Sequence, residues 1–314
     1  MVSDTNETKY NDVLREDSID LLAIAKLVWE SKGLILSVVF AGAFASVLYA
    51  LSVPNIYKSS ALLAPSEDGA GSLAQQYSGL ASLAGVALPG RDSISKANLA
   101  FEIINSREFA ASFIEKYEIM PQLLAAKRWD EADRQIIYDG EVYDPNKSKW
   151  RGSEPDPRSQ MVFGALEEVL DVARDKDTKM VTLSISHLSP DVAKQWVDWL
   201  IIEINETVRK KDITEAKQSI EFLRTQVDET SIAALETVFY DLVQSQIQTM
   251  MLAQVRPEYV FTTIDPAIAP ELRDSPNRLR IGILGSILSS LTALLLVLGK
   301  YFYRVNKQGK LEVS

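Results

Sequence analysis

The sequence has no cysteine and a single histidine, His187, among its 314 residues. The lack of cysteine excludes disulfide bonds, thiol catalysis and cysteine-ligated metal sites, although it does not decide the compartment. A lone histidine in or just after a strand fits a structural role better than a base or a ligand. The motifs HExxH, GxSxG and Walker A are also missing. We therefore expect no enzymatic activity, no cofactor and no metal.

Positive charge is scarce as well. The formal net charge is −10, and residues 54–280 carry 25 basic and 35 acidic residues. Such a surface repels nucleic acid and anionic lipid head groups. We expect no nucleic-acid partner, whereas neutral or locally bound partners stay open.

Two stretches, residues 33–53 and 281–299, contain no charged residue at all. At 1.5 Å per residue, each gives about 30 Å of helix, which is the thickness of a bilayer's hydrocarbon core. A buried core helix is the alternative, but neither stretch has the polar side that a helix of a soluble domain shows. The sequence thus predicts two transmembrane helices.

The first stretch could instead be a cleaved signal peptide, which has a short basic leader and a shorter apolar core. Here residues 1–32 precede it and are more acidic than basic. A retained anchor fits better. Within this leader, Ser18 is a predicted cap of a short helix, and Trp29 is placed as an interfacial aromatic residue.

Two spans predict that both ends of the chain, residues 1–32 and 300–314, lie on one side and residues 54–280 on the other. Lys and Arg near the spans set the orientation. The ends hold six of them and the middle segment four near the spans, which favours cytoplasmic ends and an extracytoplasmic domain. The six are Lys26, Lys32, Lys300, Arg304, Lys307 and Lys310; the four are Lys58, Arg273, Arg278 and Arg280.

Glycine and proline are absent from residues 191–256. Ser189-Pro190 is a strong helix start, and residues 213–227 repeat apolar residues at 3,4 spacing, as coiled coils do. Residues 228–231 are the expected break, after which an apolar stripe resumes at Ile232, Leu235, Val238, Phe239 and Leu242. We expect a long helical hairpin, the arm, over 190–256, with neighbouring protomers covering part of its apolar stripe; two ordinary core helices are the alternative.

The residue pattern in the remainder of the middle domain predicts the strands and helices of an α/β base. Alternation predicts strands over 56–65, 180–188 and 258–264, with Val260 or Phe261 in the core. Helices are expected over 97–117 and 159–173, and a surface excursion over 135–158. Residues 67–95 are a glycine-rich loop without the lysine that a phosphate-binding loop needs.

Three prolines, Pro266, Pro270 and Pro276, precede the second span. Prolines fix φ and favour extended geometry, so the segment 265–280 is predicted to be a semi-rigid strut. A plain linker is the alternative. Small residues recur at helical spacing in both spans, where they let helices approach closely: Gly42 and Ser46 in the first, and Gly282, Gly285, Ser286 and Ser290 in the second.

Four segments together resemble the bacterial polysaccharide co-polymerases, the Wzz-type chain-length determinants of lipopolysaccharide O-antigen. DSIDLLAIAKLVWESKGLIL resembles the family's approach to its first span, and GLASLAGVALPG a loop common in it. SISHLSPDVAKQWVDWLIIEIN is similar to its strand-turn-helix, and EYVFTTIDPAIAPELRDSPNRLRIGILG to its proline-rich segment before the second span. Residues 119–158 carry little resemblance.

The resemblance implies an inner-membrane α+β protein in which two transmembrane helices flank a periplasmic domain with an α/β base and a long helical hairpin arm. It implies a ring-shaped homo-oligomer that sets glycan chain length without catalysis, beside a membrane polymerase acting on lipid-linked polysaccharide. The kinase branch of the family has a cytoplasmic ATPase domain, which residues 300–314 are too short to form.

Two other functions stay open. A periplasmic adaptor of a polysaccharide exporter would share the layout. A two-span sensor would also share it, but it calls for a cytoplasmic output module.

Overall fold

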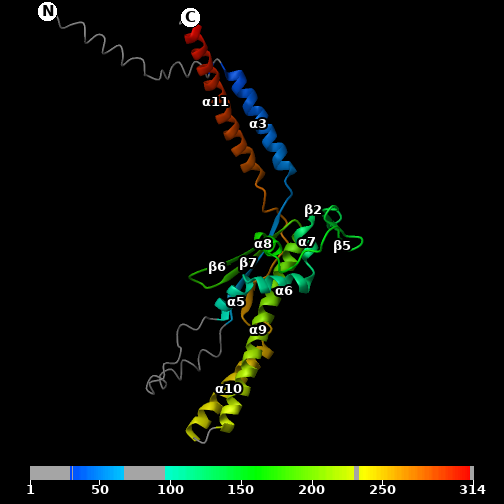
Figure 1. The fold of residues 1–314 in the computed structure, drawn as a ribbon, viewed down its shortest axis with the longest axis vertical. Coiled ribbons are helices and arrows are strands. Elements are labelled where there is room, and N and C mark those ends of the chain that lie inside the picture. Colours follow the sequence, from blue (N-terminus) through cyan, green and yellow to red (C-terminus); the bar gives the residue numbers. More distant parts are fainter. Residues whose placement is uncertain (1–28, 30, 67–95, 230–232, 312–314) are drawn as a thin grey trace, which may run out of the picture. The chain divides into compact units, whose positions relative to one another are not determined.

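The computed structural model describes residues 29, 31–66, 96–229 and 233–311. The chain forms two compact units, which divide at residues 54/55 and 275/276. The first holds both ends of the chain, and the second holds residues 55–275 (Figure 1). The expected helix at Ser18 and the glycine-rich loop 67–95 lie outside the described residues.

The first unit contains the two charge-free stretches as helices. Helix α3 runs over Lys32–Ser52 and helix α11 over Arg278–Leu311, and the two pack along each other. Both are long and apolar enough to cross a membrane, over Lys32–Ser52 and Arg278–Lys300. Few of their residues are buried within the protein, so these apolar surfaces are not those of soluble core helices. Helix α11 continues past the predicted span to Leu311.

The second unit is built on a four-stranded antiparallel sheet with the order β6-β7-β1-β8. Its strands are β1 (Tyr57–Pro65), β6 (Leu170–Arg174), β7 (Val181–His187) and β8 (Phe261–Asp265). Strand β1 is central because it pairs with β7 over seven residues and with β8 on its other side. Alternating apolar residues of β7, Val181, Leu183 and Ile185, point into the core, as alternation requires.

Short helices and two hairpins complete this base (Figure 1). The helices are α5 (Lys96–Ile104), α6 (Arg107–Tyr117), α7 (Met120–Leu124) and α8 (Gln160–Val169). The hairpins pair β2 (Ala126–Asp130) with β3 (Gln135–Tyr138) and β4 (Tyr143–Asp144) with β5 (Lys149–Trp150). The hairpins occupy most of the predicted surface excursion.

The hairpin arm is formed by α9 (Pro190–Glu229) and α10 (Ala233–Val255), which pack on each other. Helix α9 begins at Pro190, and the buried Ser189 caps it by accepting a hydrogen bond from the Val192 amide, as predicted. Its first half lies on the sheet, where Trp196, Leu200 and Ile204 are fully buried with residues of β1 and β7. At 40 residues α9 is about 60 Å long, so its second half extends beyond the base.

Three sequence predictions were wrong in detail. The helix expected over 159–173 ends at Val169, because residues 170–174 pair with β7 as strand β6. The helix expected over 97–117 is broken into α5 and α6, because Ser106 is extended and its hydroxyl accepts from the Phe109 amide to start a new helix. The strand expected over 258–264 begins only at Phe261, and both Val260 and Phe261 are buried as expected.

The predicted fold class is confirmed. Two helices that could span a membrane flank a mixed α/β unit with a long helical hairpin. The differences are shifted element ends, one helix that is broken in two, and strand β6.

Candidate interaction surfaces

The two spans meet through small residues at two points. A Cβ added at Gly42 would overlap the side chain of Ser289, and one added at Gly285 would overlap that of Ser46. Both helices therefore need glycine at these positions to approach so closely. Ser46 satisfies its hydroxyl by donating to the Gly42 carbonyl oxygen at 2.9 Å, so the contact leaves no polar group without a partner.

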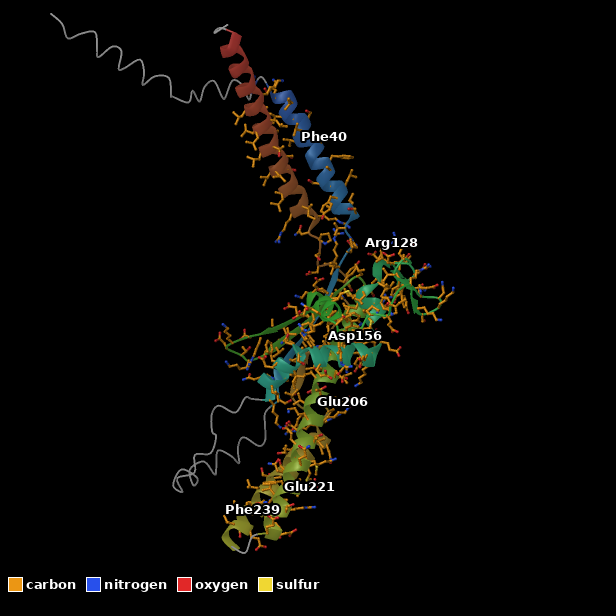
Figure 2. All side chains as sticks on the ribbon, viewed as in Figure 1. Phe40, Arg128, Asp156, Glu206, Glu221 and Phe239 are labelled. Carbon is orange, nitrogen blue, oxygen red and sulfur yellow. The ribbon has the colours of Figure 1, made fainter. Side chains whose placement is uncertain are left out.

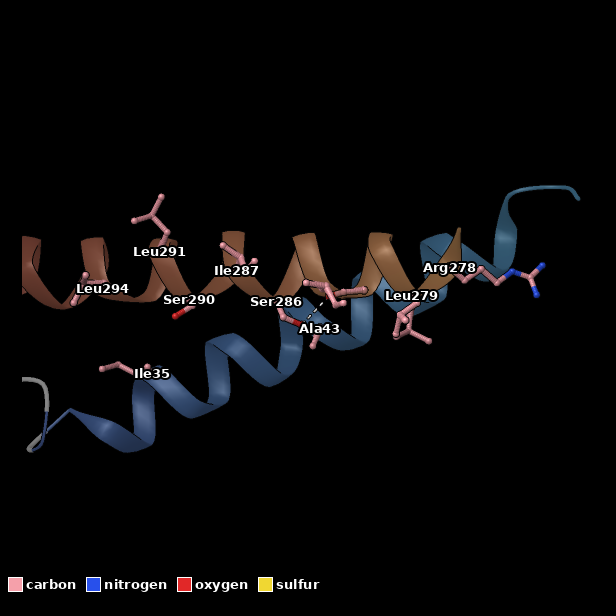
Figure 3. Close-up of a pocket in the computed structure, with 12 residues that line it drawn as sticks. Ile35, Ala43, Arg278, Leu279, Ser286, Ile287, Ser290, Leu291 and Leu294 are labelled. Carbon is pink, nitrogen blue, oxygen red and sulfur yellow. Dashed lines mark hydrogen bonds between the residues drawn. The ribbon is translucent and has the colours of Figure 1, made fainter. Parts of the chain in front are cut away.

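The other predicted small residues of α11 lie on a groove beside this contact (Figure 3). Gly282, Ser286 and Ser290 line it with Ile35 and Ala43 of α3. The groove has a volume of about 880 Å³, and a Cβ at Gly282 would meet no atom within 4 Å. The Ser286 hydroxyl donates to the Gly282 carbonyl oxygen at 2.8 Å. This side of the helix pair is open to a further apolar partner.

Arg278 joins the ends of the two spans. Its Nε donates to the Ala50 carbonyl oxygen at 3.2 Å, in the last turn of α3. Carbonyls of a last turn lack intrahelical partners, so the guanidinium both caps α3 and complements its dipole. Figure 3 shows the side chain of Arg278 directed along the axis, away from the groove's serines.

The proline-rich segment is held against the start of β1. The Ser59 hydroxyl donates to the Ile268 carbonyl oxygen at 2.7 Å, and the Ile56 amide donates to the Ser275 carbonyl oxygen at 2.9 Å. In return, the Asp274 amide donates to the Ile56 carbonyl oxygen at 2.9 Å. The stretch around Pro270 is therefore secured to the base at both of its ends. These contacts of Ser59 and Ile56 could not be predicted from the sequence, because their partners lie more than 200 residues away.

Pro266 lines a second groove, of about 560 Å³, on the base. The rest of its lining is apolar (Ile201, Ile202 and Pro257), charged (Asp198, Glu206, Arg209 and Glu258) or polar (Asn205 and Thr263). The structure does not bring Pro266, Pro270 and Pro276 into one site. Pro276 belongs to the first unit, and the other two to the second.

Asn205 connects the first half of α9, which lies on the sheet, to β8. Its side chain is buried and makes four hydrogen bonds: Oδ1 accepts from the Val260 and Phe261 amides, and Nδ2 donates to the Ile201 and Phe261 carbonyl oxygens. The returning strand is thereby fixed to α9 at Phe261. A buried amide side chain with every donor and acceptor engaged specifies one register.

A cluster of Lys96, Asp212 and Tyr259 holds the start of α5 to the arm. Lys96 Nζ lies 2.9 Å from Asp212 Oδ2 and donates to the Tyr259 hydroxyl at 2.7 Å, and that hydroxyl donates to Asp212 at 2.6 Å. Burial alone would lower the pKa of Lys96, but the hydrogen bonds with Tyr259 and Asp212 raise it above its ordinary value. Burial also raises the pKa of Tyr259, so the cluster keeps its charges at neutral pH.

Beyond the base, α10 exposes apolar side chains on two sides. Leu235, Val238 and Leu242, spaced three and four residues apart, form one side and are 43–50% exposed. The other side carries Tyr240, Met251 and Val255, which are 55–78% exposed. We call these the first and second flanks of α10. Helix α10 packs on α9, and its buried or half-buried residues include Phe239, Val243 and Ala253, which we assign to a third side.

The predicted apolar stripe of the second arm helix is only partly covered within the protomer. Phe239 is half-buried, whereas Leu235, Val238 and Leu242 are exposed. Ile232 lies outside the described residues. Because α10 is apolar on three sides and α9 covers one, two flanks remain for partners.

Within the described residues, no group of His, Cys, Asp and Glu is arranged to hold a metal ion. In that same part of the chain, every buried side-chain nitrogen and oxygen has a hydrogen-bond partner. The surfaces that stand out are the span groove, the base groove and the two flanks of α10.

The N-terminal part of the chain matches a model of a known family. Residues 17–117 match the family model described as Wzz, chain length determinant protein. Residues 17–117 are therefore similar to the Wzz chain-length determinant proteins. The match covers roughly the first third of the sequence, including α3, β1, α5 and α6. It confirms the predicted resemblance to Wzz-type proteins.

Some solved structures are distantly similar to this chain. One is a full-length bacterial polysaccharide co-polymerase, with 15% identity, a TM-score of 0.39, and coverage of 92% of this chain and 98% of that one. Another is a fragment of WzzB, a polysaccharide co-polymerase from Salmonella Typhimurium, with 16% identity, a TM-score of 0.30, and coverage of 70% and 100%. Both TM-scores are low, and nothing about function rests on these likenesses. Among curated proteins, none matches the chain.

Proposed function

We propose that the chain is a non-catalytic regulator of polysaccharide chain length in the bacterial inner membrane. The observation that carries this is the Wzz match over residues 17–117. The two apolar helices that flank an α/β unit fit it, because they could anchor that unit at a membrane. The glycan is the O-antigen of lipopolysaccharide or a related surface polysaccharide.

The experiment is a lipopolysaccharide ladder from a strain that lacks the gene, with and without the gene restored. A chain-length regulator predicts polymer of unregulated length in the deletion strain and a restored modal length on complementation. Loss of surface polymer in the deletion strain would instead identify an exporter adaptor. An unchanged ladder would contradict both functions.

The topology is part of this proposal. Both ends of the chain lie in the cytoplasm, and residues 55–275 lie in the periplasm, in line with the distribution of Lys and Arg near the spans. A reporter fused at residue 150 is expected to be active only as a periplasmic fusion. A cytosolic reporter at that position would overturn the orientation.

The regulator acts as a homo-oligomer. The two apolar flanks of α10 support this, because a protomer with different contact surfaces on two sides can bind one neighbour on each. Such heterologous contacts close into a ring when the rotation between neighbours allows it. The proline-rich segment with Pro266, Pro270 and Pro276 stiffens the link between the membrane helices and the periplasmic unit.

A further partner of the spans is a membrane helix, which belongs to the polysaccharide polymerase or to a second protomer. The polymerase acts on lipid-linked polysaccharide. The open groove at Gly282, Ser286 and Ser290 supports this, since helices associate in lipid through small residues. Gly282→Leu fills the groove and leaves the α3–α11 contact intact, because nothing lies near that position.

Gly282→Leu is therefore expected to shift the glycan length distribution without stopping synthesis. Gly285→Leu is the matched comparison, because it overlaps Ser46 and separates the two spans of one protomer. A ladder that is normal for Gly282→Leu at wild-type expression would remove the groove from the mechanism. Cross-links from a cysteine at Leu291, which lines the groove, identify the occupant.

A further inference from the structure

His187, the only histidine of the chain, lies at the junction of three elements in the base. It ends β7, three residues before the first residue of α9, and is only 6% exposed. Its Nδ1 accepts a hydrogen bond from the Ser189 amide at 3.0 Å. Its Nε2 lies 3.1 Å from the Gln122 carbonyl oxygen of α7. The imidazole thus connects β7, the start of α9 and α7.

These two bonds define the protonation state that the fold needs. Because Nδ1 accepts from an N–H, it carries no proton, and a neutral ring must then carry its proton on Nε2 and donate it to Gln122. Trp196 packs beside the ring, with centroids 5.2 Å apart, and its indole Nε1 donates to the Gln122 side-chain oxygen at 3.2 Å. Gln122 therefore ties His187 and Trp196 into one small cluster.

A second proton on His187 would disrupt this cluster. It would place an N–H on Nδ1 directly against the Ser189 N–H, so a hydrogen bond would become a repulsive contact. It would also place a positive charge at the amino end of the 40-residue helix α9, where the helix dipole opposes it. Burial lowers the pKa of His187 below its ordinary value of 6.5, against the opposing effect of its bond to the Gln122 carbonyl oxygen.

The ionisable groups on the surrounding elements have partners of their own. Tyr57 of β1, the register partner of His187, donates its hydroxyl to Glu131 at 2.7 Å, and Asp191 of α9 pairs with Arg134. Tyr138 of β3 is bonded to the side chain of Gln122, and α7 itself has no ionisable side chain. In the described part of the chain, no carboxylate forms an ion pair with the imidazole.

We propose that His187 is an acid-sensitive latch at the root of the arm, closed when the imidazole is neutral and opened by protonation. Opening frees the first turns of α9 from β7 and α7, and so loosens the helix that carries the arm. The inference stands on the geometry of the base and is independent of the proposed function.

The direction of the effect follows from linkage. The open state binds a proton below pH 6.5, whereas the closed state resists it until its own lower pKa is reached. Between those two values, the equilibrium constant for opening rises about tenfold for each unit that the pH falls. Above pH 6.5 the latch is closed and pH-independent.

The test uses the full chain in phospholipid nanodiscs, with an affinity tag free of histidine. Hydrogen exchange by mass spectrometry is followed for residues 188–200 from pH 7.5 to pH 5 and expressed as protection relative to the intrinsic rate at each pH. Protection of this segment is expected to fall by about tenfold per pH unit below 6.5, while α6, over residues 107–117, serves as the internal control.

His187→Asn is the matched variant, because its oxygen can accept from the Ser189 amide and cannot gain a charge. Its protection is expected to be independent of pH over the same range. Equal pH dependence in the two proteins would overturn the proposal.

A direct titration keeps the proposal testable if that variant does not fold. With one histidine in the chain, labelled imidazole gives a single NMR titration curve. A pKa below 6.5 is expected, and a value at or above 6.5 would show that protonation does not work against the fold, which would end the proposal.

Discussion

The two helices of the arm pack on each other, yet their outer surfaces have opposite chemistry. Helix α9 exposes charged residues beyond the base, namely Lys210, Lys211, Glu215, Lys217, Glu221 and Arg224. Helix α10 has only two charged residues, Glu236 and Asp241, and exposes apolar flanks instead. Figure 2 shows Glu221 on α9 and Phe239 near the far end of α10.

The difference teaches where each helix obtains its stability. Helix α9 is fixed by the base, since Trp196, Leu200 and Ile204 are fully buried there, and its outer half tolerates water. Helix α10 buries only Val243 and Ala253 among its described side chains, and it is apolar where it meets solvent. A single protomer thus leaves α10 incompletely covered, and neighbouring protomers are the natural cover.

The largest effect is expected from a substitution in the first half of α9, which lies on the sheet. Trp196→Ala removes a fully buried ring that packs in the core and bonds Gln122, and we expect it to destabilise the second unit by about 3–5 kcal/mol. Urea unfolding of the detergent-solubilised protein, followed by far-UV circular dichroism, measures this. A loss below about 1 kcal/mol would mean that α9 is not anchored there, on the scale of core truncations.

A second test concerns the cover of α10. Leu242→Gln lies on the first flank, where the side chain is 45% exposed, so the protomer's own stability should change by no more than about 0.5 kcal/mol. If a neighbour covers Leu242, the exchange removes apolar contact worth about 1.5–3 kcal/mol at each interface. Mass photometry should then show smaller assemblies.

Arg224→Gln is the control for Leu242→Gln, because Arg224 is exposed on the charged outer half of α9. It should leave the assembly size unchanged. If both variants dissociate the oligomer equally, or neither does, the contrast between the two helices has no role in assembly.

The smallest effect is expected on the charged surface of α9. Lys211 pairs with Glu215 one turn later, and that hydrogen bond raises the pKa of Lys211. The two side chains are 42% and 57% exposed, so Lys211→Ala should cost only about 0.3–0.5 kcal/mol. Urea unfolding at low and high salt checks this, and a loss that is large or insensitive to salt would contradict a solvated pair.

Much of the fold could be predicted because its signals are local. The spans follow from uncharged stretches of the right length, and strand β7 follows from alternation. The start of α9 follows from Ser189-Pro190, and the structure has that start at Pro190. Each of these depends on neighbouring residues alone.

The predictions were wrong where contacts between residues that are distant in the sequence determine the local structure. Residues 170–173 continue a helical pattern, but pairing with β7 turns them into strand β6. The anchoring of the proline-rich segment depends on Ser59 and Ile268, which are 209 residues apart. The side of α10 that α9 covers could not be predicted either, because a helix that is apolar on three sides does not reveal which side its partner covers.

The sequence alone determined that two helices are suited to lipid, that disulfide bonds are excluded, and that a long helical arm begins after Ser189. Those properties depend on composition and on period, which act within a few residues. Only the tertiary structure decided which glycine touches a serine, which side of α10 stays open, and that His187 joins β7 to α7 and α9. Tertiary packing determines these features, because several local arrangements have similar free energy until a residue that is distant in the sequence packs against one of them.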